Sequence, residues 1–262
     1  MSERLVGYSS ADGVATLVLD APPANAYSYE MMRQLDEAIL RARFDADVHV
    51  LLLRGSGERF FCAGADIAML RGADEAYKYN FCLHANETLN RLEQTPKLVI
   101  AALNGHTVGG GLEIALAADV RLARRGAGKL GLPEIALGVL PGTGGTQRLA
   151  RLVGRARALE LMLGGRLMDF DEAAGLGLVQ RVFDAASFEA ELGAYAAAHV
   201  PPARAALAVG LIKRAVQSGA GMSLHDGLAL ERELQQRLFQ SADAREGLAA
   251  YAEKREPRFR GR

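Results

Sequence analysis

The chain of 262 residues contains no tryptophan and only two cysteines, Cys62 and Cys82. Two cysteines outside a CxxC pair do not form a disulfide framework and are typical of a protein kept in a reducing compartment. The first residues, MSERLVGYSSADG, lack the apolar stretch of a secretory signal. Apolar runs are short, LVIAAL at 98–103 being typical, so the sequence predicts no membrane-spanning helix. We therefore expect a soluble, cytoplasmic protein without a membrane partner.

An excess of charge is also missing. Lysine plus arginine and aspartate plus glutamate number 31 each, so the formal net charge is zero. A nucleic-acid-binding domain typically carries a basic excess or a basic stripe, and the balance argues against a nucleic-acid partner. Histidine, cysteine and acidic residues have no convincing metal-ligand spacing, which predicts no metal site. The segment GTGGTQ lacks the last glycine of GxGxxG, and neither a phosphate-binding GxxxxGK(S/T) loop nor a GxSxG nucleophile elbow is present.

Strand and helix signals alternate through the first two thirds of the chain. The amphipathic segment after Ser28, a plausible helix cap, has apolar residues at helical spacing. This order predicts an α/β fold with mostly parallel strands. From about residue 200, three helical segments follow without a strand, so we divide the chain into a core (1–199) and a C-terminal helical oligomerisation lobe (200–262). The strand-like segments are 14–20, 48–55, 98–105, 120–123 and 178–184.

Two glycine-bearing loops each follow a buried strand. One contains Gly64, Ala65 and Asp66, and the other is NGHTVGGG at 104–111. Ligands of open α/β sheets bind outside the carboxyl ends of the strands. Each loop can present a free backbone N–H group at a helix start, and two such groups can hold an oxygen that becomes negative during a reaction. A structural interpretation stays open, in which the glycines form a tight turn and Asp66 caps a helix.

Two glutamates lie in apolar segments. Glu113 follows the glycines in LEIALAAD, and Glu134 lies in LGLPEIALGVL. Burial raises the pKa of a carboxyl group toward neutral pH, which suits general acid–base catalysis. Either side chain could instead complement a helix start, with Pro133 as the first helical residue before Glu134. Among the histidines only His106 lies in the glycine loop, and we interpret it as a loop contact.

Four segments occur in the order ERFFCAGADI (58–67), NGHTVGGGLEIALAADVRLA (104–123), LGLPEIALGVLPGTGGTQRLARLVG (130–154) and YAEKREPRFRG (251–261). Together they resemble the signatures of the enoyl-CoA hydratase/isomerase, or crotonase, superfamily. The resemblance covers nearly the whole chain. It implies a crotonase-like spiral of ββα units with a C-terminal helical trimerisation region, assembled as a homo-oligomer: a trimer or a dimer of trimers, which is a hexamer.

The resemblance also implies a reaction and residue roles. The expected enzyme is a lyase that hydrates 2-enoyl-CoA to 3-hydroxyacyl-CoA in fatty-acid or branched-chain acyl-CoA catabolism, and coenzyme A enters as part of the substrate, with no other cofactor. Ala65 and Gly110 match the amides of the oxyanion hole. Glu113 matches the base that activates water, and Glu134 the group that protonates C2. The matching substrate or coenzyme A contacts are Asn25, Ala63, Asp66, Ile67, Pro141, Gly142, Tyr251 and Lys254.

Three alternatives stay open at this level. The chain could be a Δ3,Δ2-enoyl-CoA isomerase on the same fold. It could also hydrate 3-methylglutaconyl-CoA, which needs a cation for the distal carboxylate; Arg71 and Lys78 are candidates. A non-catalytic RNA-binding module is the alternative of a different class, and the zero net charge argues against it.

Overall fold

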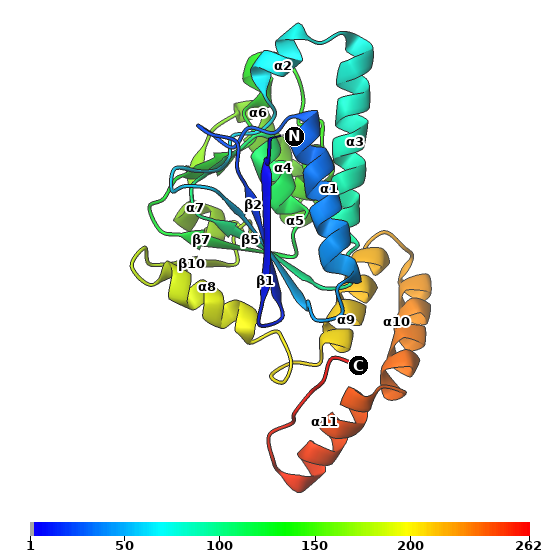
Figure 1. The fold of residues 1–262 in the computed structure, drawn as a ribbon. Helices are drawn as coiled ribbons and strands as arrows, with labels where there is room; N and C mark the ends of the chain where they lie inside the picture. The colour runs from blue at the N-terminus through cyan, green and yellow to red at the C-terminus, as the bar shows by residue number, and fades with distance from the viewer. Residues whose placement is uncertain (1–2) are drawn as a thin grey trace.

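The computed structural model describes residues 3–262, and its main element is a six-stranded sheet with the order β1-β2-β3-β5-β7-β10 (Figure 1). The first hairpin, β1–β2, is antiparallel, and all other pairs in this sheet are parallel. This confirms the expected α/β fold; the antiparallel first strand was not expected. The strands are β1 (Val6–Ala11), β2 (Val14–Leu19), β3 (Val50–Gly55), β5 (Leu98–Leu103), β7 (Val120–Arg124) and β10 (Arg181–Phe183).

A second sheet lies beyond the carboxyl ends of these strands. It has the order β4-β6-β8-β9, and β4, β6 and β8 follow β3, β5 and β7 directly along the chain. Each of these three strands, β3, β5 and β7, is thus succeeded by a short strand and then by a helix, which is the ββα repeat that the resemblance implied. The members are β4 (Phe60–Cys62), β6 (His106–Val108), β8 (Lys129–Gly131) and β9 (Met168–Asp169).

Helices cover both faces of the large sheet because alternate strand residues are apolar on both sides. Leu51 and Leu53 pack in one core cluster with Met32, whereas Val50 packs in a second cluster with Phe188. Figure 1 shows α1 and α3 side by side on one face and α8 on the other. The helices of the core are α1 (Tyr29–Phe44), α2 (Ile67–Gly72), α3 (Glu75–Glu93), α4 (Gly110–Leu116), the 3-10 helix η1 (Glu134–Leu137), α5 (Gly145–Val153), α6 (Arg155–Gly164), α7 (Phe170–Gly175) and α8 (Phe188–Ala197).

Local chemistry sets the helix ends. Ser28 caps α1 as expected, since its Oγ accepts a hydrogen bond from the Met31 amide at 3.3 Å. The strand expected at 178–184 is shorter, and its pairing with β7 begins only at Arg181. Just before it, the Gln180 amide donates to the Arg121 carbonyl and the Gln180 side-chain oxygen accepts from the Arg121 amide.

The C-terminal part consists of α9 (Ala206–Gly219), α10 (Leu224–Phe239) and α11 (Ala242–Glu253), without a strand. Figure 1 shows α10 and α11 reaching away from the body of the molecule. A buried ion pair between Lys213 and Asp119, at 2.8 Å, ties α9 to the segment between α4 and β7. None of the helices in the described range 3–262 is long and apolar enough to cross a membrane.

Candidate active site

Asn104 joins the ends of β3 and β5, the strands that lead into the two glycine-bearing loops. Its side-chain amide donates hydrogen bonds to the carbonyl oxygens of Gly55 (3.0 Å) and Gly57 (2.8 Å), and its Oδ1 accepts one from the Gly55 amide. The side chain is 2% exposed, so these bonds do not compete with water. The two loops are therefore held together at their roots. Sequence reasoning missed this residue, although it opens the quoted glycine loop.

Close backbone contact explains why glycines lie at the start of α4. A side-chain carbon on Gly110 would lie 2.4 Å from the Tyr27 hydroxyl, and one on Gly111 would lie 2.0 Å from the Cys62 carbonyl oxygen. Any larger residue would push α4 off β4 and Tyr27. A carbon on Gly64 would lie 3.1 Å from the Gly110 nitrogen, so the turn before α2 and the start of α4 lie against each other.

Both candidate oxyanion amides are free. Within residues 3–262, neither the Ala65 N–H nor the Gly110 N–H donates to a protein group. The Ala65 turn is nevertheless fixed on both sides, because the Tyr27 amide donates to Gly64 (2.8 Å) and the Asp66 amide donates to Tyr27 (2.9 Å). Gly110 is the first residue of α4, where an N–H group has no partner inside its own helix. Two adjacent turns thus each offer an unused donor.

Glu113 lies in the first turn of α4 and is 2% exposed. Its Oε1 accepts hydrogen bonds from the amides of Thr143 (2.8 Å) and Gly145 (2.7 Å), and its Oε2 accepts one from the Thr143 hydroxyl. Burial raises the pKa of the carboxyl group, while these three donors and the nearby Arg148 act in the opposite direction. Glu113 is thus buried, as its apolar neighbours indicate, and its catalytic role stays a prediction.

Glu134 is the first residue of η1, and it lies beside the glycine loop. Its Oε1 is 2.9 Å from the position that a side-chain carbon on Gly109 would occupy, and its buried Oε2 has no hydrogen-bond partner in the described residues. Burial, with a smaller contribution from the charge of Glu113, raises the pKa of this carboxyl group to about 7. The sequence predicts Pro133 as the first residue of a helix. In the structure Pro133 is instead the N-cap of η1, which is a 3-10 helix.

Arg121 fixes α4 from its other end. The guanidinium is 4% exposed and donates to the carbonyl oxygens of Ala118 (2.9 Å) and Leu178 (2.6 Å). It also donates to the carbonyl oxygen of Ala115 at 3.3 Å, and Ala115 lies in the last turn of α4, just before Ala118. The helix that carries Glu113 is therefore held by charge-assisted hydrogen bonds at its C-terminus. No sequence pattern predicts this role, because a buried arginine cannot be distinguished from an exposed one by its neighbours along the chain.

The structure gives Asn25 a loop-holding position. It has a positive φ of 52°, is 3% exposed, and donates to the carbonyl oxygens of Ser56 (3.0 Å) and Phe60 (2.9 Å). Its Oδ1 accepts from the Ala21 amide. Because these bonds use the side chain's donors and its acceptor inside the protein, we interpret Asn25 as a residue that shapes the loop. Its contact with coenzyme A stays a prediction.

The other expected substrate contacts of the core lie in two segments, residues 63–67 around Ala65 and residues 141–142 before Thr143. Asp66 caps α2, with its Oδ1 accepting from the amides of Ala68 (2.8 Å) and Met69 (3.1 Å), which is the structural alternative considered for it. Ile67 is exposed, Pro141 is buried, and the Gly142 carbonyl accepts from Asn86. Ala63 donates its amide to Ala24. Contact of Ala63, Asp66, Ile67, Pro141 and Gly142 with a substrate stays a prediction.

Tyr251 and Lys254 lie apart from this site within one chain. They are at the end of α11, which Figure 1 places well away from α4, and Tyr251 is 87% exposed. Contact of Tyr251 and Lys254 with a substrate stays a prediction.

His106 is a loop contact, as expected. It lies on β6, its Nδ1 accepts a hydrogen bond from the Lys129 amide at 3.1 Å, and its ring packs on Phe60. Within residues 3–262, no group of three or more His, Cys, Asp or Glu side chains is placed to hold a metal ion.

Comparison with known proteins places this geometry in a family. The model of the enoyl-CoA hydratase/isomerase family matches residues 9–262. A crystal structure of an enoyl-CoA hydratase from Geobacillus kaustophilus superposes with a TM-score of 0.96 at 44% identity, covering 100% of this chain and 98% of that one. A short-chain-enoyl-CoA hydratase of Clostridium acetobutylicum is 36% identical over 92% of both chains. An enoyl-CoA isomerase/hydratase of Mycosarcoma maydis is 38% identical over 97% of this chain and 96% of its own. The chain belongs to the enoyl-CoA hydratase/isomerase family.

Proposed function

We propose that this protein is an enoyl-CoA hydratase, which adds water across the double bond of 2-enoyl-CoA thioesters to give 3-hydroxyacyl-CoA. The observation that carries the proposal is the pair of glutamates beside the two free amides. Glu113 has three hydrogen-bond donors, whereas Glu134 has a buried oxygen without any and a pKa of about 7. Two carboxyl groups with contrasting surroundings suit a base and an acid acting on one substrate.

The free amides of Ala65 and Gly110 would hold the thioester oxygen. When water adds to C3, electrons move toward the carbonyl and the thioester becomes enolate-like. Two N–H donors that are already oriented stabilise that oxygen without reorganisation, and each typically contributes about 100- to 1000-fold to the rate. The bond network of Asn104 and Tyr27 supports this role because it fixes both turns before a ligand arrives.

The glutamates would divide the proton transfers. Glu113, ionised among its donors, takes one proton from the attacking water as the oxygen bonds to C3. Glu134, protonated at neutral pH in part of the molecules, gives its proton to C2 as the enolate collapses. The proton gained by Glu113 balances the one lost by Glu134, and one water molecule is consumed. General acid–base assistance of this kind contributes roughly 100- to 10,000-fold.

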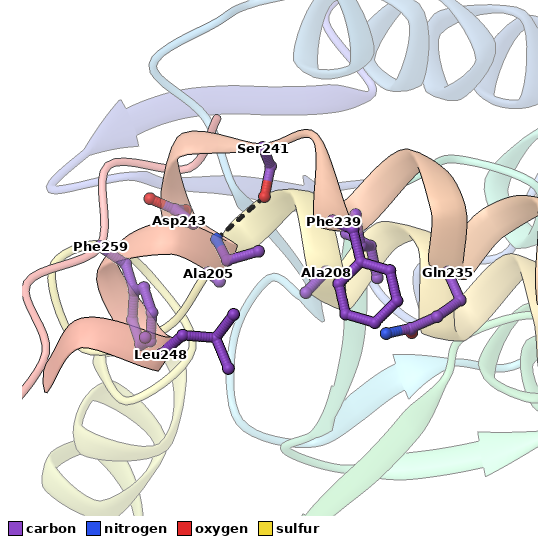
Figure 2. A pocket seen from close by; sticks show the side chains of 11 residues that line it. Ala205, Ala208, Gln235, Phe239, Ser241, Asp243, Leu248 and Phe259 are labelled. Carbon is purple, nitrogen blue, oxygen red and sulfur yellow. Dashed lines mark hydrogen bonds between the residues drawn. The ribbon is translucent and has the colours of Figure 1, made fainter. Parts of the chain in front are cut away.

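A homo-oligomer fits the C-terminal lobe. Large apolar side chains are exposed on α9, α10 and α11, and a cavity of about 320 Å³ opens between these helices. Figure 2 shows Phe239, Leu248 and Phe259 along the cavity, where the Ser241 hydroxyl accepts a hydrogen bond from the Ala244 amide at 3.0 Å and so caps α11. Contiguous exposed apolar surface favours a protein partner. We propose that copies of this chain cover it in a trimer or dimer of trimers, which would bring Tyr251 and Lys254 to a neighbouring site.

Coenzyme A would be bound only as part of the acyl-CoA substrate, and no separate cofactor is required by the chemistry above. The product class suits fatty-acid or branched-chain acyl-CoA catabolism. We keep a cytoplasmic location as part of the proposal, on the reducing environment that the two free cysteines favour.

An isomerase activity is the second candidate. The relative from Mycosarcoma maydis is named for both activities, and a group with a pKa of about 7, such as Glu134, could move a proton between C4 and C2. Hydration of 3-methylglutaconyl-CoA would require Arg71 or Lys78 to meet the distal carboxylate; they lie on α2 and α3.

Crotonyl-CoA tests the proposal directly. Hydration removes the conjugated double bond, so the absorbance of the enoyl thioester should fall when purified protein is added. A 3-enoyl-CoA, a dicarboxylic enoyl-CoA and longer or branched chains complete the panel. A protein that shifts the 3-enoyl double bond but leaves every 2-enoyl-CoA unchanged is an isomerase, and the hydratase proposal is then wrong.

A further inference from the structure

Tyr27 contacts both turns that carry the candidate oxyanion amides. Its backbone amide and carbonyl bond to Gly64 and Asp66, on the two sides of Ala65. Its hydroxyl lies against Gly110, since a side-chain carbon on that glycine would be 2.4 Å away. Its ring stacks on Phe81, with centroids 5.7 Å apart. A buried tyrosine in this place is held by packing on one side and by the backbone on the other.

The Tyr27 hydroxyl continues into a hydrogen-bonded chain that ends at Glu113. Tyr27 Oη lies 3.3 Å from Thr143 Oγ1, and Thr143 Oγ1 donates to Glu113 Oε2. A threonine hydroxyl has one proton. Because that proton is directed at the carboxylate, the tyrosine must be the donor in its bond with Thr143. All three side chains are 2% exposed, so bulk water cannot replace either link.

This series of hydrogen bonds matters because the two oxygens of Glu113 have different donors. Oε1 has two backbone donors, the amides of Thr143 and Gly145, which remain whatever side chain stands at position 143. Oε2 has the Thr143 hydroxyl as its sole protein partner within residues 3–262. A buried carboxylate oxygen without a donor loses the interaction that favours its ionised form.

We propose that Tyr27 and Thr143 are positioning residues for hydration: their hydroxyl groups form one relay that orients Glu113 Oε2 and keeps this carboxylate ionised, so that it can accept a proton from water. The inference rests on the proposed function, because it assigns Glu113 the role of the base. Tyr27 also holds the turns of Ala65 and Gly110, and a single side chain therefore fixes the base relative to both amides.

Other charged groups face Glu113 as well. Glu134 from η1 is coupled to it by like charge, and Arg148 from α5 favours the ionised carboxylate. Arg148 is itself paired with Glu93 of α3 at 2.9 Å. Cys82 of α3 lies near enough for Glu113 to raise the pKa of its thiol, after the larger effect of burial. Burial raises the pKa of Tyr27 well above its usual value, so its hydroxyl stays a neutral donor across the working range.

Four variants and two matched controls test the relay. Thr143→Val removes the hydroxyl at nearly constant shape, Thr143→Ser restores it, Tyr27→Phe removes the outer link, and the double variant Tyr27→Phe/Thr143→Val removes both. The controls are Thr88→Val and Tyr8→Phe, because each of these residues has a buried hydroxyl oxygen without a partner in the described residues. The readouts are kcat and KM for crotonyl-CoA from pH 5 to 9. The carboxyl titration of Glu113 is followed by ¹³C NMR of glutamate-labelled protein, with Glu113→Gln for the assignment.

We expect Thr143→Val to lower kcat by about 10- to 100-fold while KM changes by less than about twofold. Losing a donor to the ionised form raises the pKa of Glu113, so the acid limb of the rate profile should move up by about one pH unit. Thr143→Ser should restore both, and Tyr27→Phe should shift the limb less, in the same direction. The double variant should resemble Thr143→Val alone, because the outer link acts only through the inner one. Both controls should match the wild type.

Two outcomes overturn the relay. One is a Glu113 titration in Thr143→Val that matches the wild type, and the other is a loss of activity with an unmoved acid limb that serine does not rescue. If the wild type hydrates no enoyl-CoA, the proposed function is wrong, and the NMR titration still decides whether the two hydroxyl groups hold Glu113 ionised.

Discussion

Glu134 Oε1 lies against Gly109, 2.9 Å from where a side-chain carbon on that glycine would begin. Gly109 directly precedes the free amide of Gly110, and its carbonyl accepts the Glu113 amide at 3.1 Å. The side chain of Glu134 therefore lies beside the residue that precedes the candidate oxyanion donor and accepts a bond from the backbone amide of the candidate base. This proximity is the geometric basis for assigning the three groups to a single reaction.

Replacing either glutamate by glutamine should abolish most of the hydration of crotonyl-CoA. We expect Glu113→Gln and Glu134→Gln each to lower kcat by about 100- to 10,000-fold, because an amide can neither accept nor supply the proton. Thermal unfolding should show both variants folded. A variant with wild-type kcat would remove that carboxyl group from the mechanism.

The rate of hydration should fall as the pH rises above neutral. Glu134 must be protonated to give a proton to C2. Because its pKa is about 7, the rate should fall to half of its maximum near that pH. The kcat/KM profile for crotonyl-CoA should therefore have a basic limb close to pH 7. A flat profile up to pH 9 would contradict the assignment of Glu134 as the acid.

The same carboxyl group should make the free energy of unfolding depend on pH. Its folded pKa of about 7 lies above the ordinary value of 4.5, so the folded state binds more protons than the unfolded state in that interval. Stability is then fully present below about pH 4.5 and decreases as the pH rises through 7. The free energy of unfolding, measured by urea denaturation, should differ less between pH 5 and pH 8 for Glu134→Gln than for the wild type. Some pH dependence should remain in Glu134→Gln, because the pKa of Glu113 is also raised and this residue is unchanged in the variant.

Gly111→Ala should destabilise the fold, since its side-chain carbon would lie 2.0 Å from the Cys62 carbonyl oxygen. Backbone cannot yield as a flexible side chain does, and we expect a loss of about 1–3 kcal/mol or more. Gly193→Ala is the matched control, because Gly193 lies inside α8 with no atom within 4 Å of the added carbon. There the substitution should stabilise by about 0.5–1 kcal/mol. Equal unfolding midpoints for the two variants would contradict the close contact.

Lys254→Ala tests the role proposed for the end of α11. We expect it to raise KM for crotonyl-CoA by about two- to five-fold, as for an exposed charge contact, with little change in kcat. Crotonyl-pantetheine, which lacks the adenine nucleotide, serves as the control substrate, and its KM should not change. Equal effects on both substrates would mean that Lys254 acts on the fold and not on the nucleotide.

The sequence was informative where a residue type is rare in its surroundings. A glutamate among apolar residues and three successive glycines marked Glu113 and the start of α4, and alternating strand and helix signals predicted the parallel sheet. The second sheet was not predicted in detail from periodicity, because strands of two or three residues such as β9 and β4 are too short to show one. The contribution of Thr143 was missed because a threonine in a glycine-rich loop carries no pattern of its own.

Tyr27 shows a different limit. Its neighbours along the chain predict only a turn before α1, whereas its partners, Gly64, Gly110 and Thr143, are 37 or more residues away. Such partners are known only once the turns of three separate ββα units are placed beside one another. For Asn25, the sequence predicts a ligand contact that stays a prediction, but it did not predict that the side-chain amide bonds to backbone oxygens of another loop.

The Asn104 bonds have a consequence for altering the protein. Because one side chain joins the strand ends beneath both turns, the machinery that acts on the thioester forms a unit, whereas α2 contains no fully buried residue and packs on the core through the half-buried Met69 and Leu70. Exchange of residues 67–72 should therefore disturb the turns of Ala65 and Gly110 less than a change at Asn104 would. The exposed segment and the paired turns would then be separately adjustable parts of this scaffold.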